Sequence, residues 1–262
     1  MSLNLFSLAG RTALVCASSR GLGRGCAEAL AEAGCRVVVN GRDRDALERT
    51  AAEIRAASGA EVIAVAADVS TREGQSALIE AAGEVDILVN NNAGPPRRPF
   101  RELDREAMVA GVVQNMVTPI ELVQGVLDGM VERRFGRIVN ITSLAVLMPI
   151  VGLELSSGAR AGLTSFLAGI ARDVARHNVT INNLLPGKIA TDRLTATMRW
   201  SAERAGTSLE AELVRQTGEI PARRLGTPEE FGKICAFLCS AHAGYVTGRN
   251  FPVDGGLNPA AF

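Results

Sequence analysis

Short apolar segments alternate with segments of helical spacing along almost the whole chain, and this alternation limits the folds that the chain can adopt. The apolar segments are rich in Val, Ile, Leu and Ala on both faces, which is typical of strands in a parallel sheet that helices cover on each side. We therefore predict a single doubly wound α/β domain over residues 1–262, with a parallel sheet of about seven strands. The predicted strands are 12–17, 36–41, 61–68, 86–91, 136–143 and 179–187, with a last strand in the segment "YVTGRNFPVDGG".

The segments between the strands have helical patterns of different lengths. Residues 44–58 form an amphipathic pattern, and two longer helices are predicted at about 104–133 and 155–177. Residues 188–220 are polar and are the least regular part of the chain. A segment of this kind suits a mobile lid over a substrate site, and a solvated loop is the alternative.

Composition and charge argue against several classes of protein. The chain has 28 basic and 28 acidic residues and so lacks the basic excess of nucleic-acid binders. No apolar run is long enough to span a membrane, and the segment "MSLNLFSLAGRTALV" has no basic start or apolar core of a secretory signal. The five cysteines include no C-x-x-C pair, and the two histidines lie near no cysteine pair. We therefore expect a cytoplasmic protein with reduced cysteines, no metal, and no nucleic-acid or membrane partner.

A glycine-rich turn follows the first predicted strand, in the segment "CASSRGLGRG". Gly21 and Gly23 open the next helix, where missing side chains let the backbone approach a pyrophosphate and the helix N-terminus favours its charge. Because the turn lies between a strand and a helix, it predicts the dinucleotide site of a Rossmann fold, and an ordinary strand-to-helix turn is the alternative. Ala17 stands where a first glycine would be expected and is tolerable only if its φ is negative.

The end of the second predicted strand indicates which dinucleotide binds. NAD sites usually place an acid there to bind the ribose 2′-hydroxyl, but this chain has Asn40, followed by Gly41 and Arg42. Arg20 and Arg42 would suit a 2′-phosphate, because a guanidinium binds such a group as a fork. We therefore expect NADP, with NAD less favoured, and two solvated surface arginines are the alternative.

Further motifs follow in order along nearly the whole chain. They are "AADV" at 66–69, "NNAG" at 91–94, "NITS" at 140–143, "PGKIATD" at 186–192 and the C-terminal "YVTGRNFPVDGG". With these segments the chain resembles the short-chain dehydrogenases/reductases, especially the single-domain type that includes 3-oxoacyl-(acyl-carrier-protein) reductases. The resemblance implies an oxidoreductase that acts on a small carbonyl or alcohol substrate and assembles as a homo-oligomer, most often a tetramer.

The same resemblance assigns residues to the site. Ser143 would be the catalytic serine, and Asn115 would hold a water for proton relay. The expected cofactor contacts are Ser18, Arg20, Gly21, Leu22, Gly23, Arg42, Asp68, Val69, Asn91, Ala93, Gly94, Arg160, Pro186, Gly187, Ile189 and Thr191.

The chain departs from the family where the catalytic Y-x-x-x-K would lie. Counting 13 residues on from Ser143 reaches Ser156, and four further on is Arg160, in "LELSSGARAG". In the family a lysine next to the tyrosine lowers the phenol's pKa, so that it can exchange the proton that accompanies hydride transfer. A serine hydroxyl has neither that acidity nor that reach, and a guanidinium does not donate its proton at ordinary pH.

Other residues give few replacements for the missing acid. The chain has a single tyrosine, Tyr245, in the C-terminal motif, which leaves Lys188 and Glu154 as candidates. A solvated lysine and a helix N-terminal acid are their alternative roles. Two functions therefore remain open: an NADP-dependent oxidoreductase with an atypical proton relay, or a catalytically inactive dinucleotide-binding sensor or scaffold. A fold without any cofactor is a third, to which Ala17 lends slight support.

Overall fold

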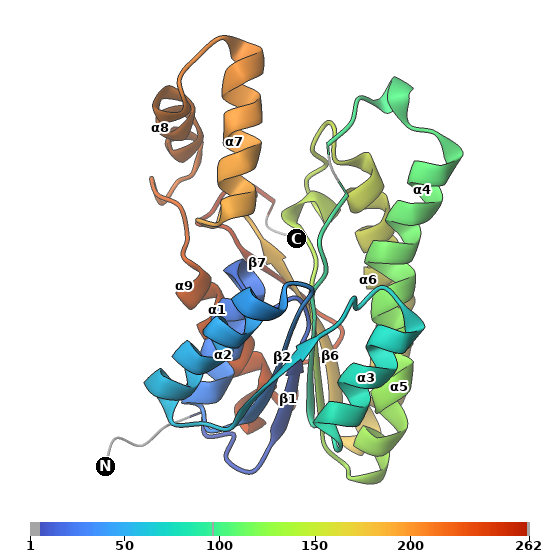
Figure 1. Cartoon of the computed structure of the whole chain (residues 1–262). Coiled ribbons are helices and arrows are strands. Elements are labelled where there is room, and N and C mark those ends of the chain that lie inside the picture. The colour runs from blue at the N-terminus through green and yellow to red at the C-terminus, as the bar shows by residue number, and fades with distance from the viewer. Residues whose placement is uncertain (1–5, 96, 261–262) are drawn as a thin grey trace.

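The computed structural model describes residues 6–95 and 97–260 and contains one parallel sheet with helices on both faces (Figure 1). Its seven strands run in the order β3-β2-β1-β4-β5-β6-β7, and every neighbouring pair is parallel. This confirms the predicted doubly wound α/β fold. The strands are β1 (Thr12–Val15), β2 (Arg36–Gly41), β3 (Val62–Ala66), β4 (Ile87–Asn90), β5 (Gly136–Ile141), β6 (Val179–Pro186) and β7 (Asn250–Val253).

The helices form two layers, each with its own buried core. Alternate side chains of the strands enter opposite cores, as the two-residue period of a strand requires. The first core lies under α1 (Gly21–Glu32), α2 (Arg44–Ser58) and α9 (Pro228–Cys239). The second lies under α3 (Arg72–Ala82), α5 (Thr118–Glu132) and α6 (Glu154–Val174). Because helices cover both faces of the sheet, polar side chains that follow the strands lie at the ends of the strands.

Two expectations about the helices need correction. Residues 188–220 are not irregular, since they form α7 (Asp192–Ala205) and α8 (Leu209–Glu219), which project past one end of the sheet in Figure 1. Their start signals were present in the sequence: Thr191 and Ser208 each accept a hydrogen bond from a backbone N–H of the first turn. The long helix at 104–133 is divided, because a π-helical segment at Val113–Val117 lies between α4 (Arg105–Val112) and α5.

A row of four asparagines ties together the carboxyl half of the sheet. Asn90, Asn140, Asn183 and Asn250 lie opposite one another on β4, β5, β6 and β7. Each side-chain amide donates to the next side-chain oxygen, at distances of 2.9, 3.0 and 2.9 Å. Buried amides require such partners, so the row fixes the register of the strands from which much of the site follows.

The cysteines are buried as free thiols at all five positions. None of the helices in the described parts of the chain is long and apolar enough to cross a membrane. Within those parts, no group of three or more His, Cys, Asp or Glu side chains is arranged to hold a metal ion. The first five residues of the segment considered above for a secretory signal lie outside the described residues.

The turn after β1 contains a strained alanine. Ala17 has a φ of 45°, in the left-handed region that favours glycine, so the condition of a negative φ is not met. Its amide N–H donates to Asn40 Oδ1 at 3.0 Å, and its carbonyl accepts from Asn91 Nδ2 at 3.0 Å. A Cβ at Gly23 would lie 2.4 Å from that carbonyl oxygen. Asn40, Asn91 and the close approach of Gly23 therefore fix the turn and keep Ala17 at its unfavourable φ.

We predict that Ala17→Gly stabilises the protein by about 0.5–1 kcal/mol, because relief of the left-handed strain exceeds the added entropy of the unfolded chain. Urea unfolding at one fixed protein concentration measures the change. The matched control is Ala13→Gly in β1, which removes a fully buried methyl group without strain relief and should destabilise by about 1–2 kcal/mol. A comparable loss for both variants would contradict the assignment of strain to residue 17.

Candidate active site

The carboxyl end of β5 presents Ser143, two residues after the strand. It begins the 3₁₀ turn Leu144–Val146, and its Oγ accepts a hydrogen bond from Ala145 N at 3.1 Å. The side chain is half-buried, and its hydroxyl proton is not used in that contact. Ser143 is thus held by its own turn with an O–H available to a substrate oxygen.

Ser156 and Arg160 form a buried unit on one face of α6. The two residues are 7% and 8% exposed, and Arg160 Nε donates to Ser156 Oγ at 3.1 Å. The guanidinium also donates from Nη1 to Ile141 O at 2.5 Å and from Nη2 to Asn92 O at 3.4 Å. The small serine leaves room for the guanidinium to lie back along the helix, next to the strand end that carries Ser143.

The charge of Arg160 has no acidic partner among the ion pairs of the described residues. Burial, and then the charge of Arg193, lower its pKa to about 10, so it still carries its charge at neutral pH. A guanidinium has five N–H groups. Three of them donate in the contacts just given, so two remain for a ligand. Arg160 can therefore attract a negative charge in this site.

Asn115 lies in the π-helical segment and is 3% exposed. Its Nδ2 donates to Gly111 O at 3.4 Å, while its Oδ1 is buried without a hydrogen-bond partner in the described structure. Single π-helical turns often mark functional sites, and a buried acceptor without a donor calls for a bound water or ligand. The geometry suits the water-holding role that the family resemblance implied.

The glycine turn lies at the same end of the sheet, where the strands have their carboxyl ends. Gly21, with a φ of 59°, opens α1, whose first turn contains no acid, and a Cβ there would lie 3.5 Å from Thr191. This bare helix start is open to an anion such as a pyrophosphate. Ser18 is different, because it is fully buried and its Oγ donates to Val15 O and accepts from Asn40 N. Its side chain supports the turn from below and is not directed to a ligand.

Asn40 lies at the end of β2, where an acid would bind the ribose of NAD. Asn40 is buried; its Nδ2 donates to Val65 O and Ala67 O, and its Oδ1 accepts from Ala17 N. These contacts direct the buried side chain into the protein and away from a ribose hydroxyl. Arg20 and Arg42 are both exposed. Within residues 6–95 and 97–260, neither guanidinium forms an ion pair or a hydrogen bond.

Asp68 lies beyond β3. Its carboxylate accepts from Ser70 Oγ at 2.6 Å and from Ser70 N at 2.9 Å, and these bonds, with a smaller contribution from Arg42, lower its pKa. The remaining predicted cofactor contacts lie in segments at the carboxyl ends of β3, β4 and β6 or beside the glycine turn. Leu22 and Gly94 are partly buried, Val69 is buried, Ala93 is exposed, and Pro186, Gly187, Ile189 and Thr191 lead from β6 into α7.

None of the candidate replacement acids has a suitable arrangement. Lys188 Nζ donates to Glu219 Oε2 at 2.6 Å and to Gln216 O at 3.3 Å, so it holds α8. Glu154 is exposed, and a hydrogen bond from Gly152 N lowers its pKa, so it is ionised at neutral pH. Tyr245 is fully exposed.

Two arginines near the site were missed by sequence reasoning. Arg193 donates from Nη1 to Gly94 O at 3.0 Å and from Nη2 to Pro95 O at 3.4 Å. Arg97 follows in the same loop. A signal was available, since Arg193 lies in the first turn of α7, where the helix dipole disfavours a cation.

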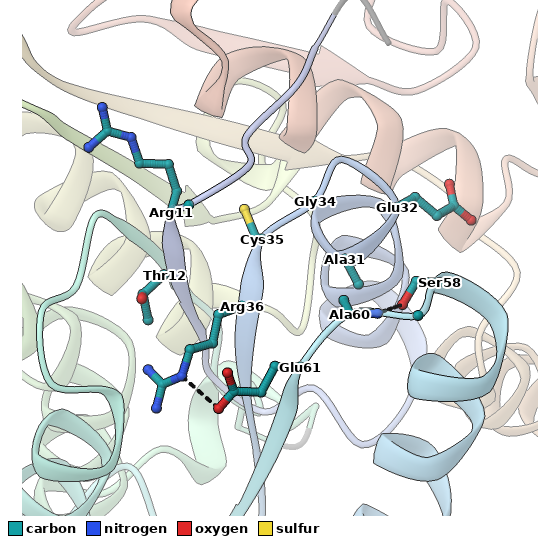
Figure 2. Close-up of a pocket in the computed structure, with 12 residues that line it drawn as sticks. Arg11, Thr12, Ala31, Glu32, Gly34, Cys35, Arg36, Ser58, Ala60 and Glu61 are labelled. Atoms are coloured by element: carbon teal, nitrogen blue, oxygen red, sulfur yellow. Dashed lines mark hydrogen bonds and ion pairs between the residues drawn. The ribbon is translucent and has the colours of Figure 1, made fainter. Parts of the chain in front are cut away.

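A hollow of about 480 Å³ lies at the opposite end of the sheet, where the strands begin (Figure 2). It is lined from the starts of β1 and β2 and the end of α2, and it contains the ion pair between Arg36 and Glu61 at 3.0 Å. None of its lining residues is a predicted site residue. Ligands of open parallel sheets bind at the carboxyl ends of the strands. This hollow lies at the amino ends and is therefore not the expected dinucleotide site.

Comparison with known proteins agrees with the fold. The sequence profile of the family described as Enoyl-(Acyl carrier protein) reductase matches residues 16–258. The 3-oxoacyl-[acyl-carrier-protein] reductase of Vibrio cholerae is 35% identical over 96% of this chain and 98% of its own. The acetoacetyl-CoA reductase of Cupriavidus necator is 37% identical over 67% of each chain.

Solved structures give the same result. L-sorbose reductase from Gluconobacter frateurii, solved with NADPH and L-sorbose, superposes with a TM-score of 0.92 at 29% identity, over 97% of this chain and 99% of that one. YwfH, an NADPH-dependent reductase involved in bacilysin biosynthesis, superposes with a TM-score of 0.90 at 30% identity, over 95% and 99%. The chain belongs to the short-chain dehydrogenase/reductase family.

We predict that Arg160→Met raises the free energy of unfolding at pH 7 by on the order of 2 kcal/mol, because a buried cation without an acid costs more than its hydrogen bonds return. The arginine's pKa is lower in the folded than in the unfolded chain. Its penalty is therefore complete below pH about 10 and is relieved as pH rises above that value. The gap between variant and wild type should stay constant from pH 7 to about 9 and begin to narrow as pH rises above about 10.

Ser156→Ala is the control, since it removes one acceptor of Arg160 and keeps the charge. It should destabilise by about 1 kcal/mol, opposite in sign to the methionine variant. Chemical unfolding of all three proteins in the same buffers measures both effects. A methionine variant less stable than wild type at pH 7 would show that the hydrogen bonds of Arg160 outweigh its buried charge.

Proposed function

We propose that the protein is an NADP-dependent oxidoreductase that transfers a hydride between the nicotinamide and a carbonyl or alcohol substrate, with an atypical proton relay. The observation that carries the proposal is the convergence of Ser143, Arg160 and the glycine turn at one edge of the sheet, where Arg160 binds the carbonyl of Ile141, two residues before Ser143. The relatives named above are reductases, and two of the structures have NADPH in their descriptions.

The residues present fit the cofactor. The bare start of α1 suits the pyrophosphate, Asp68 and Val69 suit the adenine, and Arg20 and Arg42 suit the 2′-phosphate. When bound, NADPH supplies the hydride. Side chains of this protein orient the substrate and stabilise the charge that develops on it.

Ser143 and Arg160 divide the work on the substrate. The hydroxyl of Ser143 orients the carbonyl oxygen by donating to it. As the carbonyl carbon accepts the hydride, negative charge develops on that oxygen, and the buried guanidinium stabilises it because its charge is weakly screened there. The resulting alkoxide takes a proton from a water, and the hydroxide left behind takes up a proton from the solvent. Oδ1 of Asn115 is the acceptor that can hold such a water. The balance is carbonyl plus hydride plus proton, giving alcohol.

We predict that Arg20→Ala with Arg42→Ala removes most of the preference for NADPH over NADH. Each charged contact contributes about 1.5–3 kcal/mol, so NADPH affinity should fall at least about tenfold while NADH affinity changes little. Fluorescence titration with each cofactor measures this. Arg49→Ala, an exposed arginine of α2, is the matched control and should leave both affinities unchanged. A wild-type protein that binds NADH as tightly as NADPH contradicts the proposal.

We predict that wild-type activity on simple ketones, aldehydes and 3-oxoacyl thioesters is very low, and that Ser156→Tyr with Arg160→Lys raises it at least about tenfold, within the range of general acid catalysis. The single change Ser156→Tyr should do less, because the Arg160 guanidinium occupies the space beside residue 156. NADPH absorbance with a carbonyl panel measures the rates. Adding Ser143→Ala to the double variant should abolish the gain.

Two outcomes would redirect the interpretation. Wild-type turnover of about 1 s⁻¹ or more, typical of enzymes, would mean that another group supplies the acid, to be sought with Lys188→Ala and Glu154→Gln. If NADPH binds tightly and neither wild type nor double variant reduces any carbonyl, the protein is a dinucleotide-binding protein without turnover.

We further propose a homo-oligomer, most simply a tetramer of closed symmetry. Apolar side chains lie exposed on one side of the molecule, on α4, the π-helical segment and α6, where a partner would cover them. They are Met108, Val109, Val112, Val113, Val117 and Phe166. Light scattering at micromolar concentration should give a multiple of 27.5 kDa. Phe166→Glu should shift the mass towards the monomer, and a monomeric wild type would contradict the proposal.

A further inference from the structure

Three arginines, Arg97, Arg160 and Arg193, gather around the loop that follows β4, and we call them the arginine cluster. Arg160 donates to the carbonyl of Asn92, and Arg193 donates to the carbonyls of the two residues at 94 and 95. Arg97 comes from the loop itself. The cluster therefore combines side chains of α6, α7 and the loop, which lie far apart in the sequence.

Arg97 is the least satisfied member of the cluster. Its Nε is buried and has no hydrogen-bond partner in the described structure. Its guanidinium carbon lies 5.7 Å from the ring centre of Trp200 on α7, and Arg204 approaches the same ring to 4.8 Å. Trp200 thus has cations as neighbours, and Met198, another apolar residue of α7, is buried at 3% exposure. This end of the site is cationic rather than apolar.

Negative charge near the cluster is scarce. None of its three members takes part in an ion pair between described residues, and the one acid that acts on Arg97 is Glu154, which is exposed and binds Gly152 N. Arg193 is exposed as a residue, but its guanidinium lies against backbone carbonyls, and loss of hydration, then the charge of Arg97, lower its pKa. The start of α7 adds positive potential from the helix dipole. Like charges held together in this way are costly unless an anion neutralises them.

We propose that the substrate carries an anionic group, a carboxylate or a phosphate, which binds Arg97 and Arg193 while its carbonyl lies at Ser143 and Arg160. The proposal rests on the proposed function and adds the substrate class to it. Guanidinium groups bind both anions as a fork, and each contact of this kind is stronger than a neutral hydrogen bond. The charge of Arg193 acts on Arg160 and that of Arg97 acts on Arg193, so the two parts of the substrate would bind to neighbouring cations.

Binding to NADP⁺-loaded protein tests the proposal without turnover. The probes are two matched pairs: acetoacetate with methyl acetoacetate, and dihydroxyacetone phosphate with dihydroxyacetone. Calorimetric titration should show that the anionic member of at least one pair binds about tenfold or more tightly than its neutral partner. The pair that shows the difference distinguishes carboxylate from phosphate.

Variants connect this preference to the cluster. Arg193→Gln and Arg97→Gln should each weaken binding of the preferred anion about tenfold, and Arg193→Lys should retain part of the affinity because it keeps the charge. Arg199→Gln, the same change at an exposed arginine of α7, should leave affinity unchanged. Melting curves of each variant show that it is folded.

Three results would overturn the proposal: equal binding of anionic and neutral members in both pairs, glutamine variants that bind like wild type, or an Arg193→Gln variant that loses NADPH affinity as strongly as anion affinity. The last would make the cluster a contact for cofactor phosphates. Failure of the proposed function is separate, because it would appear as an absence of NADPH binding, while anion binding to the unloaded protein that depends on Arg193 would still support the cluster as a site.

Discussion

The chain of amide hydrogen bonds from Asn90 through Asn140 and Asn183 to Asn250 is the interaction on which the geometry of the site depends. A parallel sheet buried on both faces has side chains that are nearly all apolar, and such strands could slide without a large change in burial. Four amides in register prevent this, because a shifted strand would leave buried polar groups unpaired. The strand ends that carry the loop at 91–95, Ser143 and the segment at 186–191 are therefore fixed relative to one another.

A second constraint acts at the reaction centre. Ser156 and Arg160 stand where the family resemblance implied a tyrosine and a lysine, and the two are complementary, since the guanidinium donates to the serine hydroxyl. The result is a fixed, buried cation with spare donors and no adjacent acid. Such a group favours negative charge that develops on a substrate, and it supplies no proton. In the proposed function, the chemistry is thereby shifted from proton donation towards electrostatic stabilisation.

The same excess of positive charge continues outwards through Arg193 and Arg97. Enzymes keep unfavourable arrangements where function requires them, because a site optimised for stability alone would pair or remove these charges. The left-handed Ala17 in the cofactor turn is a smaller example of the same kind. Strain and uncompensated charge thus collect at one edge of the sheet, while the two cores beneath it are regular.

The sequence by itself determined the fold, because strands apolar on both faces between amphipathic helices have few other solutions. It also predicted the glycine turn, Ser143, Asn115 and the Ser156–Arg160 pair as site residues, since local spacing defines each of them, and these assignments stay predictions. Only the tertiary structure showed that Ser18 is directed inwards, that Lys188 is held by Glu219, and that residues 188–220 are helical. It alone revealed the arginine cluster, because its members are separated by up to about a hundred residues and meet only where loops at the carboxyl edge converge.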